Sequence, residues 1–208
     1  MTAVEPGVAR LPAMPHPSDH PAIRRVVDAA ARMAVTLEVT TFEESTHTAE
    51  EAARALGAEL GQIVKSLVFV APGPDGSTEP VLCLVSGVNR VDLARLATAT
   101  GHADIRRASA REANELTGFT IGGIPPIGHA RPIRVIMDPD LGSFQVVWAA
   151  AGTDTAVFPV PPATLRTLAN AMVAPIIDER HPAEPARSEN QAGAAFAPAP
   201  ASPQNAGG

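Results

Sequence analysis

Two strongly apolar segments joined by a turn-rich linker constrain the fold of this chain more than any other feature. The segments are IVKSLVFV (63–70) and VLCLVS (81–86), and the linker is APGPDGSTEP (71–80). Glycine, proline, aspartate and serine between two such runs are typical of a hairpin, so we expect the segments to pair antiparallel. Neither segment alternates apolar with polar residues, which indicates that both faces of the sheet are covered.

Capping signals and hydrophobic spacing locate the other elements. Thr48 and Glu51 form a capping box ahead of a helix that Gly57 ends, and Ser109 and Glu112 form a second one. We expect helices at 20–34, 49–56, 93–100, 110 to near 118, and 162–172, and further strands at 37–42, 103–108, 132–138, 144–150 and 156–160. Strands and helices are interspersed without regular β-α alternation, which predicts an α+β (mixed α/β) domain with a partly antiparallel mixed sheet.

The two ends of the chain differ in composition from its centre. Residues 1–17 are rich in proline and lack any period, and residues 181–208 are rich in alanine, proline and glycine. Such segments have little surface to bury and cannot offset their ordering entropy, so we expect both to be disordered. The folded domain is predicted to span 18–180.

Several classes of protein are excluded by what the sequence lacks. A net charge of −6 argues against a nucleic-acid coat protein, and one cysteine argues against a disulfide framework. No apolar run reaches the roughly 18 residues of a membrane span, and the N-terminus is no secretory signal. The chain is therefore expected to be soluble and cytoplasmic, without a membrane partner. No Walker A, GxGxxG, HExxH or GxSxG motif occurs, and no common cofactor signature is present.

Lys65 is the one lysine among sixteen basic residues, and it lies within the first apolar segment. An isolated ammonium is not buried there without a partner or an opening. One interpretation is a lysine that extends from the end of a strand to water. Because the chain uses arginine at every other basic position, the alternative is that a compact ammonium with a tunable pKa is needed.

A loop rich in glycine and proline is the second candidate for chemistry. It contains Gly122, Gly123, Ile124, Pro125 and Pro126. Glycines let the backbone approach a ligand closely, and prolines stiffen the loop, so its remaining amides can be aimed at a carbonyl or carboxylate. The alternative is a rigid structural turn.

Three further features carry weaker signals. The spacing of the histidines matches no metal motif, although His47 and His129 could reach a site. Cys83 is better explained as a small buried apolar residue than as a nucleophile. Residues 90–134 carry a net charge of +3, which suits either a phosphate backbone or an ordinary solvated face.

Taken together, TAEEAARALG, QIVKSLVF, VLCLVSG, VDLARLA and ELTGFTIGGIPPIGH resemble the YbaK/EbsC/ProX family, over about residues 20–178. These proteins are free-standing relatives of the editing domain of bacterial prolyl-tRNA synthetase. The resemblance implies a barrel-like mixed sheet surrounded by helices. It also implies trans-editing, which is hydrolysis of the ester in mischarged aminoacyl-tRNA, without a metal or cofactor.

The resemblance also implies the residues of the site. Lys65 would be the essential lysine, and amides near Gly122 and Gly123 would hold the ester carbonyl while water attacks. Residues expected to contact the substrate are Phe42, Thr48, Ser66, Ile124, Pro125, Pro126, His129, Gly152 and Thr153. Ser66 either tunes the pocket or simply packs.

The substrate and the partners stay open at this point. Relatives divide among Cys, Ala, Ser and Thr esters, with tRNA-Pro among the tRNAs considered, and Asp154 stands where related sequences can carry histidine. An aminoacyl-tRNA synthetase is a further candidate partner. The alternative to an enzyme is a non-catalytic module of the same fold that binds tRNA ends or a synthetase. A third hypothesis is a scaffold that uses the C-terminal segment.

Overall fold

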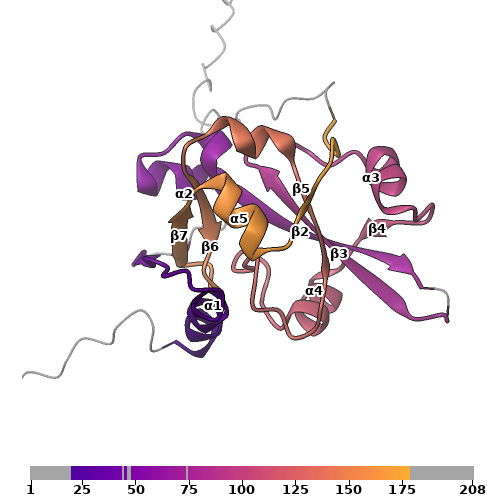
Figure 1. Cartoon of the computed structure of the whole chain (residues 1–208), viewed down its shortest axis with the longest axis horizontal. Coiled ribbons are helices and arrows are strands. Elements are labelled where there is room, and N and C mark those ends of the chain that lie inside the picture. The colour runs from indigo at the N-terminus through magenta and orange to yellow at the C-terminus, as the bar shows by residue number, and fades with distance from the viewer. Residues whose placement is uncertain (1–19, 44, 46–47, 74, 179–208) are drawn as a thin grey trace, which may run out of the picture.

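The structure, a computed structural model, describes residues 20–178 apart from 44, 46–47 and 74. It is a mixed α+β domain, as the sequence predicts (Figure 1). The elements are α1 (Pro21–Ala31), β1 (Thr40–Thr41), α2 (Ala49–Leu56), η2 (Leu60–Gln62), β2 (Val64–Pro72), β3 (Thr78–Ser86), α3 (Leu93–Thr100), β4 (Arg106–Arg107), α4 (Ala110–Thr117), β5 (Arg134–Met137), η3 (Pro139–Ser143), β6 (Val147–Ala150), β7 (Ala156–Val160), α5 (Pro162–Leu168) and β8 (Met172–Val173). Both predicted terminal segments lie outside the described residues.

The predicted hairpin is confirmed and forms the centre of the larger sheet. β2 and β3 pair antiparallel from Val64 opposite Ser86 to Pro72 opposite Thr78. The sheet continues in the order β4-β2-β3-β5-β8, and β5 runs parallel to both β3 and β8. The apolar side chains of the hairpin divide between two separate cores, so both faces are covered, as expected.

The expectation of one barrel-like sheet is wrong, because the strands form two sheets that do not close. The second sheet has the order β1-β7-β6 and lies to the left of the hairpin in Figure 1. A single parallel bridge between Ile63 and Trp148 joins this sheet to the start of β2. On the same edge, β4 pairs with β2 only at Phe69 and Val70. This edge of β2 therefore has no strand partner between the bridge at Ile63 and the contact at Phe69.

Three helices, α2, α3 and α4, begin and end within a residue of where their caps predict. Thr48 and Ser109 each accept a hydrogen bond from the backbone of a glutamate three residues later, and both capping boxes are complete. Asp92 caps α3 through two backbone N–H groups. Gly57 and Gly101 end their helices in the left-handed conformation, which glycine adopts at little cost.

Several predicted boundaries are wrong. The helix expected over 20–34 ends at Ala31, and the strands expected over 103–108 and 144–150 are confined to Arg106–Arg107 and Val147–Ala150. The helix expected over 162–172 stops at Leu168, because Asn170 takes a left-handed φ of 45° and the chain then enters β8. The strand expected over 37–42 pairs only at Thr40 and Thr41, which lie opposite Val157 and Ala156 of β7.

Candidate active site

A cavity of about 410 Å³ lies where the two sheets meet. Its wall includes the part of β2 between the Ile63 bridge and the first contact with β4 at Phe69. α2, the glycine loop and the turn between β6 and β7 supply the other walls. Of the residues predicted for the site, those that line the cavity are Thr48, Lys65, Ser66, Gly122, Ile124 and Thr153.

Lys65 is anchored by the chain that leaves β3. Its Nζ donates to the carbonyl oxygen of Gly87 at 2.9 Å and, in a shorter bond, to that of Asn89. An ammonium has three N–H donors, so one is left for a ligand in the cavity. Gly87 suits this position because a Cβ there would lie 2.1 Å from the Leu60 carbonyl oxygen.

The two carbonyl groups that hold Lys65 are themselves fixed by a buried carboxylate. Asp138 is fully buried and accepts from the Asn89 side chain at 2.8 Å and from the Ser86 backbone N–H at 3.1 Å. Asn89 also donates to Asp140 at 2.8 Å. This network sets the position of the loop and therefore of the Lys65 ammonium.

Several charges act on Lys65. Burial lowers its pKa below the ordinary value for lysine and is the strongest influence. Glu50 and Asp138 raise the pKa of Lys65, whereas Arg90 and Arg107 lower it. Of these residues Glu50, Arg90 and Arg107 also line the cavity, which gives it both cationic and anionic groups.

Ser66 points to the opposite face of β2 from Lys65, because successive side chains on a strand alternate. Its neighbours on that face, Val64 and Val68, belong to the larger core. The Ser66 hydroxyl oxygen is buried and has no hydrogen-bond partner in the described part of the chain.

Of the two glycine amides predicted to donate to a substrate carbonyl, only one is available. Gly122 lines the cavity at a φ of 92°, and its N–H has no acceptor among the described residues. The N–H of Gly123 donates to the Thr120 carbonyl at 3.1 Å, so it is not aimed at a ligand. Gly123 instead allows close packing, since a Cβ there would lie 2.6 Å from the Thr153 backbone.

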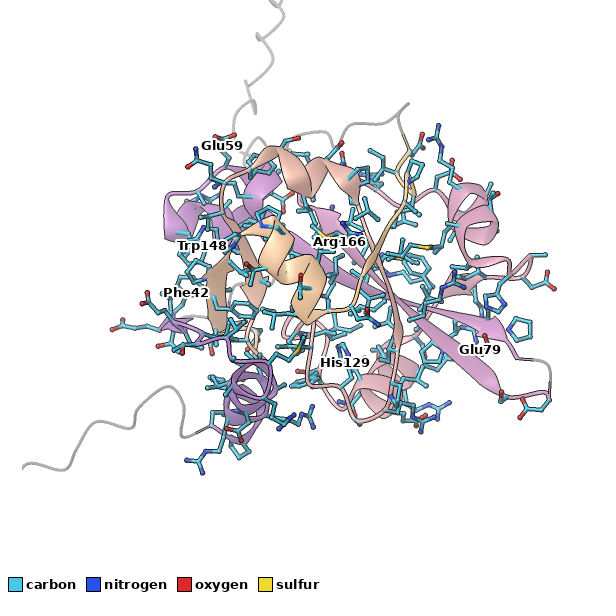
Figure 2. All side chains as sticks on the ribbon, in the orientation of Figure 1. Phe42, Glu59, Glu79, His129, Trp148 and Arg166 are labelled. Carbon is cyan, nitrogen blue, oxygen red and sulfur yellow. The ribbon has the colours of Figure 1, made fainter. Side chains whose placement is uncertain are left out.

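His129 lies behind the glycine loop and does not line the cavity. Its Nε2 and the Pro125 carbonyl oxygen lie 2.8 Å apart, and burial lowers the pKa of His129. Phe119 packs edge-on against it and under the Arg25 guanidinium, which lies 3.7 Å from the ring centre. In Figure 2 His129 lies between α1 and α4.

Four other predicted residues also stay outside the cavity lining. Pro125 and Pro126 are buried in the loop. Gly152 sits against α1, where a Cβ would lie 2.8 Å from the Ala22 carbonyl oxygen. Phe42 is half-buried, donates its N–H to the Thr155 carbonyl at 2.8 Å, and lies at the left of Figure 2.

The sequence reasoning missed several residues of the cavity as members of the site. Glu50 was visible only within a capping box, and Arg90 and Arg107 only as part of a basic region. Trp148 comes from β6 and was missed altogether. Asp154, noted from the sequence only as a position where relatives differ, comes from the turn after β6 and accepts from Ser45 at 2.6 Å. Their convergence depends on how the two sheets meet, which no local pattern records.

Cys83 is fully buried, and burial raises its pKa to about 12, which fits an apolar core residue. Among the described residues no three His, Cys, Asp or Glu side chains gather as metal ligands would. None of the helices in the described part of the chain has the length and hydropathy needed to cross a membrane.

The fold and this cavity define the class of protein. The aminoacyl-tRNA editing domain matches residues 43–168, and the chain belongs to that family. The resemblance found in the sequence is thereby confirmed.

Individual relatives agree with this assignment. YwhH of Bacillus subtilis is 34% identical over 128 residues, which are 62% of this chain and 78% of YwhH. EbsC of Enterococcus faecalis, described as a proposed Cys-tRNA(Pro)/Cys-tRNA(Cys) deacylase, is 27% identical over 65% of this chain and 80% of EbsC. The crystal structure of a proposed trans-editing enzyme for prolyl tRNA synthetase is 46% identical, with a TM-score of 0.69, and the match covers 76% of this chain and 98% of that one.

Proposed function

We propose that this chain is a trans-editing aminoacyl-tRNA deacylase that hydrolyses the ester of a small amino acid on a mischarged tRNA. The observation that carries the proposal is Lys65, a half-buried ammonium with one free donor at a cavity in a domain of the editing family. The deacylase description of EbsC and the prolyl-tRNA synthetase connection of the 46% identical structure support it. tRNA-Pro is therefore one candidate carrier.

The chemistry requires polarisation of the ester carbonyl. Water adds to the carbonyl carbon, the bond from this carbon to the ribose oxygen breaks, and the ribose oxygen receives a proton. The products are the free amino acid and the uncharged tRNA. The Gly122 N–H donates to the developing oxyanion, and Lys65 supplies positive charge to the oxyanion or to the phosphate of the terminal adenosine. A ribose hydroxyl of the substrate helps to orient the water.

The cavity offers separate surroundings for the two ends of such a substrate. On the side of Lys65 lie Arg90 and Arg107, both exposed, which suit the phosphates of a tRNA 3′ end. The face of β2 that carries Ser66 packs on the larger core, and the cavity-lining residues of that core near it, Ala108, Ala113 and Ile124, are apolar and mostly small. Small walls of this kind select against larger side chains by steric exclusion.

The test is deacylation of one tRNA charged in turn with Cys, Ala, Ser or Thr, with the cognate Pro-tRNA as the control. The proposal expects turnover of at least one of the four small esters above the uncatalysed rate and sparing of Pro-tRNA. If the chain bound tRNA ends but hydrolysed none of the four esters, the enzyme proposal would be wrong. The alternative of a non-catalytic binding module would then hold.

A further inference from the structure

The outer edge of β2 is open at the cavity. β4 covers this edge at Phe69 and Val70, and the bridge to Trp148 covers it at Ile63. Among the described residues, no strand or bridge partner lies opposite Ser66 on the side away from β3. The open edge is therefore one short stretch of strand with a cavity beside it.

The backbone groups of Ser66 point outward at this edge. The Ala108 N–H donates to the Val68 carbonyl oxygen, so the backbone of Val68 faces away from β3. In an antiparallel ladder the N–H and C=O of one residue share a side and alternate along the strand. Ser66, two residues earlier, therefore presents its N–H and C=O to the cavity.

The Ser66 side chain adds a hydroxyl with no partner. Its oxygen is buried and makes no hydrogen bond in the described chain, and Ser66 is one of the residues that line the cavity. A buried hydroxyl without a partner is unfavourable in an apolar setting, and a ligand that supplies a donor or acceptor relieves that penalty.

The ammonium of the aminoacyl group has better partners in the cavity than the Ser66 hydroxyl. A cation that leaves water is best paired with a carboxylate, and Glu50 and Asp154 both line the cavity. The ester carbonyl has N–H donors at Gly122 and at the open edge. The Ser66 hydroxyl is then left for a neutral polar group on the side chain of the amino acid.

We propose that Ser66 is a specificity-determining residue that hydrogen-bonds the side-chain hydroxyl of the ester, so that the chain prefers Ser and Thr esters to Ala esters. This inference rests on the proposed function and names its substrate class. A site that hydrogen-bonds a substrate hydroxyl discriminates strongly against an analogue without one, because its own polar group is then left unpaired.

The test compares Ser- and Ala-charged forms of the same tRNA with wild type, Ser66→Ala and Ser66→Thr. Wild type should favour the Ser ester. Ser66→Ala should lower kcat/KM for the Ser ester by about 10- to 100-fold, with little change for the Ala ester, and Ser66→Thr should retain the preference. A preference for Ala by wild type, or an equal loss on both esters in Ser66→Ala, overturns the inference.

A binding measurement separates this inference from the proposed function. Seryl- and alanyl-adenosine analogues with a non-hydrolysable amide link are titrated calorimetrically into wild type and Ser66→Ala. Tighter binding of the seryl analogue, lost in Ser66→Ala, supports the role of Ser66 even if no ester is turned over. Equal affinities in wild type, or no binding of either analogue, overturn it. The melting temperature of Ser66→Ala should be no lower than that of wild type, because the fold gives this hydroxyl no partner to lose.

Discussion

At the scale of single residues, the site depends on two neighbours that face opposite ways. Lys65 reaches the carbonyls of Gly87 and Asn89 on one side of β2, whereas Ser66 faces the larger core on the other. Because the strand edge between them is open, one cavity contacts both side chains. A charged group and a small neutral one are thus positioned by a single strand.

Gly123 gives a prediction at this scale. A Cβ at this position would lie 2.6 Å from the Cα of Thr153, and backbone atoms cannot yield as a flexible side chain can. Gly123→Ala should destabilise the fold by about 1–3 kcal/mol in urea unfolding and should lower deacylation by displacing Gly122.

Gly142→Ala is the matched control, because nothing lies within 4 Å of a Cβ built there. It should leave both stability and deacylation close to wild type. If Gly123→Ala behaved like this control, the close packing of the loop against the Thr153 turn would not matter for the site.

Single residues were predictable where their surroundings were local. The apolar segment around Lys65 and the loop at Gly122 identified both residues before the fold was known. The predicted donor role of Gly123 failed because its N–H is used by Thr120, three residues away. The residue types of a loop do not show which of two adjacent N–H groups donates to a carbonyl within the turn and which one stays available for a ligand.

At the scale of elements, the helix caps offer a matched pair of variants. Thr48 and Ser109 both complete capping boxes, but Thr48 lines the cavity together with three residues of α2, whereas α4 contributes only Ala113. Thr48→Ala and Ser109→Ala should each cost about 1 kcal/mol of unfolding free energy.

The two variants should differ in activity. Thr48→Ala is expected to lower kcat/KM for deacylation, since it loosens the helix that carries Glu50, whereas Ser109→Ala should have a smaller effect. Equilibrium unfolding and steady-state kinetics on the same preparations decide the matter. A larger loss of activity in Ser109→Ala would contradict the placement of α2 at the site.

Helices were predicted well where capping residues close by in the sequence set their ends. Caps at Thr48, Asp92 and Ser109 placed three helices within a residue of their observed bounds. The end of α5 was missed because a left-handed Asn170 and pairing of Met172 with Ile136 depend on the neighbouring strand.

At the scale of the whole molecule, the cavity exists because the two sheets do not close into a barrel. The bridge at Ile63 and the contact with β4 leave the edge of β2 open between them. The class of the fold was predictable from the mixture of elements. The gap was not, because it depends on pairings between strands far apart in the sequence.

Removal of residues 181–208 tests whether the domain alone is sufficient. Among the described residues, all those that line the cavity lie between 48 and 157, so the shortened chain should deacylate with kcat and KM close to those of the full chain. A large loss of activity would show that the C-terminal segment contributes to the site. Loss of a binding partner with intact activity would favour the scaffold hypothesis for that segment.

The central claim is tested most directly by single-turnover deacylation with wild type, Lys65→Ala and Lys65→Arg, on the small ester that wild type hydrolyses best. Lys65→Ala should slow the chemical step by about 10²- to 10³-fold, the loss typical for a donor to an oxyanion. Lys65→Arg should recover only part of the rate, because a planar guanidinium does not match the two carbonyls that hold the ammonium. A near-normal rate in a folded Lys65→Ala protein would contradict the account.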